Sequence, residues 1–275
     1  MIKRILVGLC GTPCTPPAIQ YGLDLARAHG ASLTGITVID VGSIEQEVPD
    51  FVRVSPLAGL AVQPKLEEVG RRVESSIADF QRACEAAGVP AGVRRETGEP
   101  LDSIISAWRY HDLVLLGLRG FFDYGLVHEP QDAIYRLISH GVRPIIAVPE
   151  RHRPVRRALV AYHGSMESAK AMKRFAQMRL WPEVDVHVAC FEKPDPEAEE
   201  LLRDAAGYLA AHGCPVTTHR ETGPARGHLL SLAERLEADV LVLGSGHRGM
   251  LSRRLFGDTV FDAIRRAELP LFLAH

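Results

Sequence analysis

Cysteine is scarce in this sequence, and the few cysteines lack the spacing of a metal site or a disulfide framework. Only 5 of the 275 residues are cysteine, and none form a C-x-x-C pair. Scattered thiols in odd number are typical of a reducing compartment, so we expect a cytoplasmic location. The 12 histidines form no H-x-x-x-H or H-E-x-x-H pattern, so we expect no metal site.

Neither an excess of one charge nor a long hydrophobic run is present. Lys and Arg number 32 against 34 Asp and Glu, a net charge of −2, so no overall field attracts nucleic acid or an anionic membrane surface. The longest apolar runs, such as Leu113–Leu118, are far shorter than the ~20 residues that span a bilayer. With 46% hydrophobic and 24% charged residues, the composition is that of an ordinary soluble globular protein. We therefore expect neither a nucleic-acid nor a membrane partner.

The sequence repeats itself, which indicates two equivalent domains. Four segments of the first half (4–12, 94–98, 111–120 and 143–150) resemble segments 157–165, 219–223, 238–247 and 269–275 of the second. The second of these pairs shares Arg-Glu-Thr-Gly without a change, and from there onward matched positions stay 125 to 127 residues apart. The first half has about 28 extra residues, which we assign to an irregular segment, Val41–Gln63. We predict domains at 1–150 and 155–275, joined at Glu150–Pro154.

Within each half, short apolar runs alternate with amphipathic stretches, a pattern typical of a parallel sheet with helical crossovers. The predicted strands are 5–9, 32–39, 92–96, 113–117 and 145–148, then 158–162, 185–189, 217–221, 240–244 and 271–274. The predicted helices are 17–29, 64–87, 100–110 and 131–140, then 167–178, 196–212, 225–237 and 258–266. We predict an α/β fold of two Rossmann-like, doubly wound, five-stranded parallel sheets with helices on both faces. The two sheets should be separate units packed against each other, with any ligand at the carboxyl ends of the strands.

A glycine-rich, basic loop follows the fourth strand of the second half. It begins Gly244-Ser245-Gly246-His247-Arg248-Gly249, includes Arg253 and Arg254, and ends at Gly257, Asp258 and Thr259, where a helix starts. Glycines let backbone N–H groups approach phosphate oxygens, and the dipole of the helix favours an anion at its N-terminus. The loop indicates a phosphate site; the alternative is a solvated turn.

Both halves resemble the universal stress protein family, here in tandem. The resemblance covers nearly the whole chain and rests on the repeat, on the loop from Gly244 to Gly257, and on the first-strand turn His163-Gly164-Ser165. In the ATP-binding members, the glycine loop holds the phosphates and an acidic residue of the turn approaches the ribose. The resemblance thus implies ATP or a related adenine nucleotide at these residues. It also implies an intrachain pseudo-dimer in which the fifth strands meet, and it allows two such chains to pair as a homodimer.

The second half departs from the family pattern at three positions. His163 replaces the ribose-contacting acid, and imidazole does not coordinate magnesium as a carboxylate does. His247 replaces the second glycine; the alternative alignment, Gly246-x-x-Gly249, keeps both glycines but leaves only seven residues before Gly257. Asp258 replaces Ser or Thr at the expected helix N-cap, where its carboxylate competes with a phosphate for the amides, although the neighbouring Thr259 could supply a hydroxyl.

The first half departs further. Cys10 stands at the acidic position, and the loop after Gly117 holds Phe121, Phe122, Asp123, Tyr124 and Glu129. Aromatic rings fill the space that a nucleotide uses, and carboxylates repel phosphate. We therefore predict at most one nucleotide per chain, bound by the second half. Cys10 and Cys14 lie one turn apart near the start of the first helix, which predicts a lowered thiol pKa, but we interpret both as structural cysteines.

Three functions remain open. The first is a stress-response protein that binds a nucleotide and is non-catalytic, or at most a weak ATPase; the glycine loop favours it. The second is a nucleotide-independent scaffold with a protein partner that the sequence does not identify; His163, Asp258 and Cys10 favour it. The third is a small-molecule sensor built from the aromatic first-half loop and the extra segment. No G-x-S-x-G motif occurs, so we predict no catalytic residues.

Overall fold

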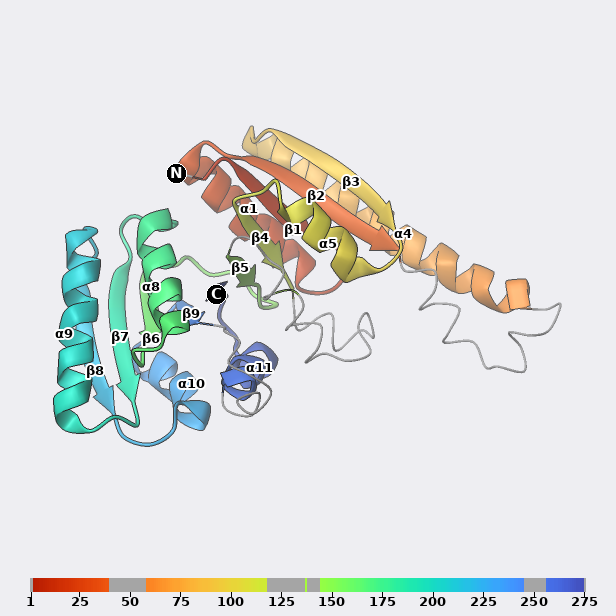
Figure 1. The fold of residues 1–275 in the computed structure, drawn as a ribbon. Coiled ribbons are helices and arrows are strands. Elements are labelled where there is room, and N and C mark those ends of the chain that lie inside the picture. Colours follow the sequence, from red (N-terminus) through yellow and green to blue (C-terminus); the bar gives the residue numbers. More distant parts are fainter. Residues whose placement is uncertain (1, 40–57, 118–136, 138–143, 245–255, 275) are drawn as a thin grey trace.

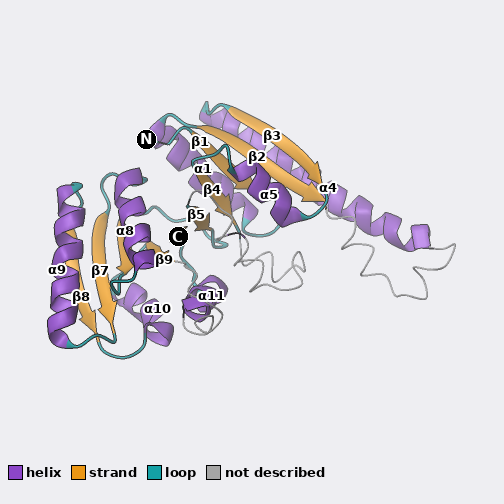
Figure 2. Cartoon of the chain, viewed as in Figure 1, coloured by secondary structure: helices purple, strands orange, loops and turns teal. Residues whose placement is uncertain are grey.

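The structure, a computed structural model, describes residues 2–39, 58–117, 137, 144–244 and 256–274. The two halves lie side by side, with the C-terminus and the fifth strand of the first half between them (Figure 1). The helices pack against the strands of each half (Figure 2).

Ten strands are described, five in each half. In the first half they are β1 (Arg4–Gly8), β2 (Ser32–Ile39), β3 (Ala91–Thr97), β4 (Leu113–Leu116) and β5 (Ile145–Ala147). In the second half they are β6 (Arg157–Ala161), β7 (Asp185–Phe191), β8 (Val216–Glu221), β9 (Val240–Gly244) and β10 (Leu271–Ala274). Neighbouring strands within each half are parallel, and the two halves have the same strand order. The predicted doubly wound parallel fold is confirmed.

The described helices are α1 (Thr15–His29), α4 (Ala58–Ala87), α5 (Pro100–Trp108), α8 (Met166–Met178), α9 (Asp195–Ala211), α10 (Ala225–Arg235) and α11 (Phe256–Arg266). The helix predicted to begin at Pro64 begins at Ala58 instead, because Pro64 lies inside the helix and not in its first turn. Residues 58–63, predicted to be irregular, are therefore helical. Residues 41–57 and most of the helix predicted at 131–140 lie outside the described residues.

The two halves are not separate sheets, and that prediction is wrong. β5 pairs with β10 in antiparallel orientation, so the strands form one ten-stranded sheet in the order β3-β2-β1-β4-β5-β10-β9-β6-β7-β8. Leu271 lies opposite Ala147, and Phe272 lies opposite Ile146. Each half would otherwise have an unpaired apolar edge, and the pairing satisfies the backbone groups of both edges. The expectation that the fifth strands meet is confirmed.

The hydrophobic core is continuous through this junction on both faces of the sheet. On one face Ile146 and Phe272 join the core that packs α1, α4, α8 and α9, and the ring of Phe272 meets that of Phe175 edge-on, with centroids 5.5 Å apart. On the other face Leu271 and Leu273 join the core of α5, α10 and α11. The halves therefore share two cores rather than having one core each.

An aspartate before the fourth strand of each half ties that strand to the first. The Oδ2 of Asp112 accepts hydrogen bonds from the backbone N–H of Lys3 and Arg4, at 2.8 and 3.1 Å. The Oδ2 of Asp239 accepts from the N–H of Arg156 and Arg157 in the same way, at 2.8 and 2.9 Å. This duplicated clamp gives a physical reason for the repeat at these two positions.

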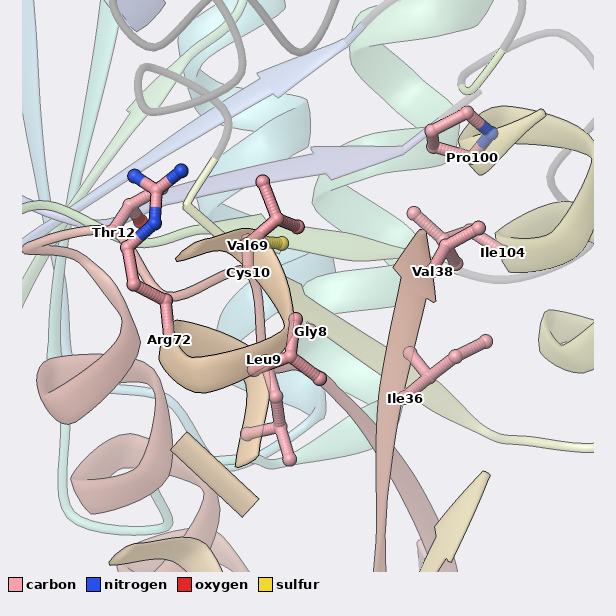
Figure 3. Close-up of a pocket in the computed structure, with 11 residues that line it drawn as sticks. Gly8, Leu9, Cys10, Thr12, Ile36, Val38, Val69, Arg72, Pro100 and Ile104 are labelled. Carbon is pink, nitrogen blue, oxygen red and sulfur yellow. The ribbon is translucent and has the colours of Figure 1, made fainter. Parts of the chain in front are cut away.

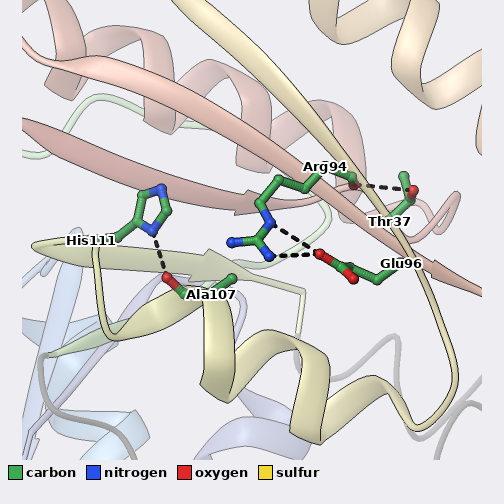
Figure 4. Close-up of polar contacts among 5 residues, drawn as sticks. All are labelled: Thr37, Arg94, Glu96, Ala107 and His111. Atoms are coloured by element: carbon green, nitrogen blue, oxygen red, sulfur yellow. Dashed lines mark hydrogen bonds and ion pairs between the residues drawn. The ribbon is translucent and has the colours of Figure 1, made fainter.

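The duplicated Arg-Glu-Thr-Gly segment begins on the outer strands β3 and β8, and its glycines, Gly98 and Gly223, lie beyond the strand ends. On β3, Arg94 donates two hydrogen bonds to Oε1 of Glu96, at 2.7 and 3.0 Å, and its carbonyl accepts from the hydroxyl of Thr37 (Figure 4). Nearby, Nδ1 of the buried His111 donates to the carbonyl of Ala107 at 2.8 Å (Figure 4). Burial lowers the pKa of His111, and the two arginines Arg4 and Arg94 lower it slightly more.

In the second half, a pair of imidazoles joins the outer strand to its neighbour, in place of the ion pair between Arg94 and Glu96 of the first half. Nδ1 of His187 on β7 lies 2.9 Å from Nε2 of His219 on β8, and the side chains are half-buried. Burial lowers the pKa of both rings, and the charge on His187 opposes protonation of His219. Arg157 and Arg235 lower these pKa values further, while Asp185 and Glu221 raise them.

We predict that removing either clamp destabilises the chain by a similar amount. Asp112→Ala and Asp239→Ala each leave two backbone N–H groups without their carboxylate, at a cost of about 1–3 kcal/mol in the free energy of unfolding. Urea denaturation measures this cost. Asp79→Ala, which removes only an exposed pair with Arg82, is the control and should cost less than about 0.5 kcal/mol. A loss of stability in only one of these two variants would contradict the prediction that the two clamps are equivalent.

We also predict that stability falls with acid. The folded-state pKa values of His187 and His219 lie below the unfolded value, so below about pH 6.5 the unfolded chain binds more protons than the folded one. The melting temperature should therefore be lower at pH 5.5 than at pH 7.5. His219→Gln should reduce this drop, whereas His228→Gln, which changes an exposed ring, should leave it unchanged. An equal drop in both variants would rule out the histidine pair as its source.

Candidate functional site

The turn after β6 is built around Gly164 at the carboxyl edge of the sheet. Gly164 has a φ of +81°, a backbone conformation that side chains with a Cβ rarely adopt. A Cβ here would also lie 2.7 Å from Cδ2 of Leu201 on α9. The turn between His163 and Ser165 therefore requires glycine for both conformation and space.

Hydrogen bonds fix the two residues that flank this glycine. Ser165 is the N-cap of α8, and its Oγ accepts from the backbone N–H of Ser168 at 3.2 Å. The Ser168 hydroxyl donates back to the Ser165 carbonyl at 2.9 Å. The N–H of Ser165 donates to Nδ1 of His163 at 3.3 Å, so a neutral His163 has its proton on Nε2.

Gly244 ends β9 against the first turn of α8. A Cβ at Gly244 would lie 2.5 Å from the carbonyl of Glu167 and from the N of Ser168. β9 and β6 are adjacent strands, so the structure brings Gly244 together with the turn His163–Ser165 at one switch point. The first glycine of the loop thus has a packing role, whatever the loop binds.

The remaining loop residues are only partly described. Ser245, Gly246, His247, Arg248 and Gly249 lie outside the described residues. α11 begins at Phe256, so Gly257 and Asp258 belong to its first turn, and Asp258 is not the N-cap residue that the sequence predicts. The prediction took the helix to start where the glycines end, but the helix includes the last glycine. Thr259 is half-buried on α11.

The first half has a pocket at the carboxyl ends of β1 and β2. Its volume is about 70 Å³, and Figure 3 shows Cys10 next to Val69 of α4, with Arg72 of α4 on one side and Ile36 and Val38 of β2 on the other. Burial, together with a smaller effect of the neighbouring Cys14, raises the pKa of the Cys10 thiol to about 12. The predicted lowering of this pKa is wrong, because the surroundings of Cys10 are apolar and outweigh the start of the helix.

A larger hollow of about 360 Å³ lies beside this pocket, over the start of α1. Thr12 and Arg72 line both spaces, and the larger one is also lined by Thr15, Gln20, Ser75 and Ser76. The start of α1 offers few backbone donors there, because Pro16 and Pro17 have no N–H and the N–H of Thr15 bonds to the carbonyl of Thr12.

Sequence reasoning missed the contribution of α4 to this pocket. Val69, Arg72 and Val73 are separated from β1 by some 60 residues of chain, and only the packing of α4 brings them to Cys10. Their spacing of three and four residues, which places them on one helix face, was the available signal. The aromatic residues Phe121, Phe122 and Tyr124, with Asp123 and Glu129, lie outside the described residues.

Within the described part of the chain, no group of three or more His, Cys, Asp or Glu side chains is arranged to hold a metal ion. Among the helices described there, none is both long and apolar enough to cross a membrane.

Comparison with known proteins gives one consistent family. The model described as "Universal stress protein family" matches residues 1–136 and 154–275. Universal stress protein G of Shigella flexneri is 33% identical over 79 residues, which are 29% of this chain and 55% of that protein. The match thus spans about half the length of this curated relative.

Solved structures agree over the full length of the chain. A universal stress protein from Archaeoglobus fulgidus DSM 4304 superposes with a TM-score of 0.70 at 18% identity, covering 98% of this chain and 95% of that one. A protein of unknown function from Pseudomonas aeruginosa PAO1 superposes with a TM-score of 0.62 at 16% identity, covering 99% and 92%. At these identities the likeness shows the fold.

We predict that Gly244→Ala destabilises the chain by about 1–3 kcal/mol or more, because the new methyl group would overlap the backbone of α8. Gly207→Ala on α9 is the matched control. A Cβ there meets no heavy atom within 4 Å, so alanine should stabilise the helix by up to about 1 kcal/mol. Chemical denaturation of both variants tests this. A Gly244→Ala variant as stable as the wild type would show that Gly244 of β9 does not pack closely against the backbone of α8.

Proposed function

The chain belongs to the universal stress protein family, and on that premise we propose that it is a non-catalytic stress-response protein that binds one adenine nucleotide, ATP or a relative, in its second half. We assign it no catalytic residue. The proposed contacts are the turn His163, Gly164 and Ser165, the loop Gly244, Ser245, Gly246, His247, Arg248 and Gly249, and the helix start Gly257, Asp258 and Thr259.

One observation carries the proposal. The turn His163–Ser165 and the loop that starts at Gly244 converge on the carboxyl ends of the adjacent parallel strands β6 and β9. In open α/β sheets this switch point is where ligands bind. A ligand here would meet the first turn of α8, and it would also be reached by a glycine-rich segment that leads into the N-terminus of α11.

Charge favours the second half over the first. The sequence between Gly244 and Gly257 contains Arg248, Arg253 and Arg254 and no acidic residue, whereas the corresponding first-half segment contains Asp123 and Glu129. Guanidinium groups stabilise a polyphosphate, and carboxylates at ~4 Å oppose it by about 1–4 kcal/mol, depending on the local dielectric. This difference supports one nucleotide per chain rather than two.

A nucleotide-independent scaffold is the second candidate, and one observation favours it. The polar groups of the described turn already satisfy one another, since the Ser165 hydroxyl caps α8 and Nδ1 of His163 accepts from Ser165. These internal bonds compete with the contacts that a ribose would need in this turn.

Isothermal titration of ATP, ADP and AMP into the full chain decides between these candidates. We predict a stoichiometry of one, abolished by Gly249→Asp and by Gly257→Asp, because each change adds a carboxylate and bulk to the phosphate cradle. Gly120→Asp, which adds the same carboxylate to the first-half loop, is the control and should leave the affinity unchanged. Two nucleotides per chain would contradict the proposal, and no binding of any of the three would favour the scaffold.

A further inference from the structure

The first-half pocket is apolar almost throughout. Its walls include the aliphatic side chains of Leu9, Ile36, Val38, Val69, Val73 and Ile104. The Cys10 thiol that also lines it has its pKa raised to about 12 by burial, so it stays neutral and is only a weak hydrogen-bond partner at physiological pH. Such a surface favours a hydrocarbon group over a polyol or a sugar.

One cationic side chain stands at the border of this pocket. Arg72 on α4 lines both the pocket and the larger polar hollow beside it. Among the described residues the structure records no hydrogen bond or ion pair to Arg72, and two of the acids that follow it on α4 pair with other arginines. Asp79 lies 3.3 Å from Arg82, and Glu74 lies 3.0 Å from Arg95.

The second half has no equivalent of this cation in its described part. Arg72 packs against Gly11, with its Cβ 3.3 Å from the position that a Cβ of Gly11 would take. The matching Gly164 is covered instead by Leu201 of α9. The combination of an apolar pocket and an unpaired guanidinium is therefore a property of the first half, and the internal repeat does not explain it.

Size and charge together define a ligand class. A volume of about 70 Å³ holds roughly five water-sized atoms, at about 10–15 Å³ each. A single guanidinium matches the single charge of one carboxylate and can bind it by charge-assisted hydrogen bonds. Thr12, which also borders both spaces, adds one hydroxyl at the same boundary.

We propose that the first half binds a small monocarboxylate with an apolar body of about five carbons, its hydrocarbon part among Ile36, Val38, Val69 and Val73 and its carboxylate at Arg72. This site is separate from the proposed nucleotide site of the second half and differs from it in ligand chemistry. Its occupancy does not depend on whether the second half binds a nucleotide.

Hexanoate is the probe, and methyl NMR of the full chain labelled at Ile, Leu and Val is the readout. Hexanoate should shift the methyl signals of Ile36, Val38, Val69 and Val73 in a saturable way, and leave those of β6–β9 unchanged. Arg72→Gln should weaken its affinity at least threefold. Arg71→Gln removes the same charge from the neighbouring exposed position of α4 and should change the affinity by less than a factor of two.

Two further measurements keep the assignment of ligand class testable. 1-Hexanol, which has the same chain but no charge, should bind more weakly than hexanoate to the wild type and equally to wild type and Arg72→Gln. Val38→Phe should abolish the shifts by filling the pocket, with the melting temperature of this variant checked against the wild type. Unshifted methyl signals, or equal affinities in Arg72→Gln and Arg71→Gln, would overturn the proposal. Displacement of hexanoate from these methyl groups by ATP would identify the pocket as a nucleotide site and would also overturn it.

Discussion

The antiparallel pairing of β5 with β10 is the constraint on which the rest of the structure depends. It converts two five-stranded parallel sheets into one sheet and carries both hydrophobic cores across the junction, through Ile146 and Phe272 on one face and Leu271 and Leu273 on the other. The linker reinforces it, since the imidazole of His152 lies 2.7 Å from the carboxylate of Asp24 on α1. Because the pairing uses the fifth strand of each half, a homodimer of this chain would need another surface.

Much of the fold follows from the sequence because the signals for it are local and duplicated. The runs around Leu115 and Val242 are apolar on every residue, as strands buried on both faces must be, and their repeat fixes the number of domains. The union of the two sheets was not predictable in the same way. An apolar fifth strand such as Leu271–Ala274 can be covered by a helix or loop, or it can pair with another strand. Its sequence is compatible with both, and the pairing becomes visible only when the fifth strands of the two halves are seen side by side.

The positions of the candidate site that require glycine were predictable from the sequence. The positions that are filled by side chains from distant segments were not. Gly164 and Gly244 stand out in the sequence, and the structure gives each a steric reason. Arg72 and Leu201 do not stand out, because helix residues that face a neighbouring turn look like any other residues of an amphipathic helix. Yet these two side chains make the halves chemically different. Arg72 places a cation beside an apolar pocket, whereas Leu201 places a hydrocarbon side chain over the equivalent turn.

The central claim is that one duplicated fold has come to hold two non-equivalent sites. The most direct test titrates ATP into methyl-labelled full-length protein that is already saturated with hexanoate. The account predicts that ATP shifts methyl signals of the second half, such as those of Val160 and Leu243 near the ends of β6 and β9, while the shifts of Val38 and Val69 caused by hexanoate persist. Matching shifts at equivalent positions of both halves, with loss of bound hexanoate, would contradict it.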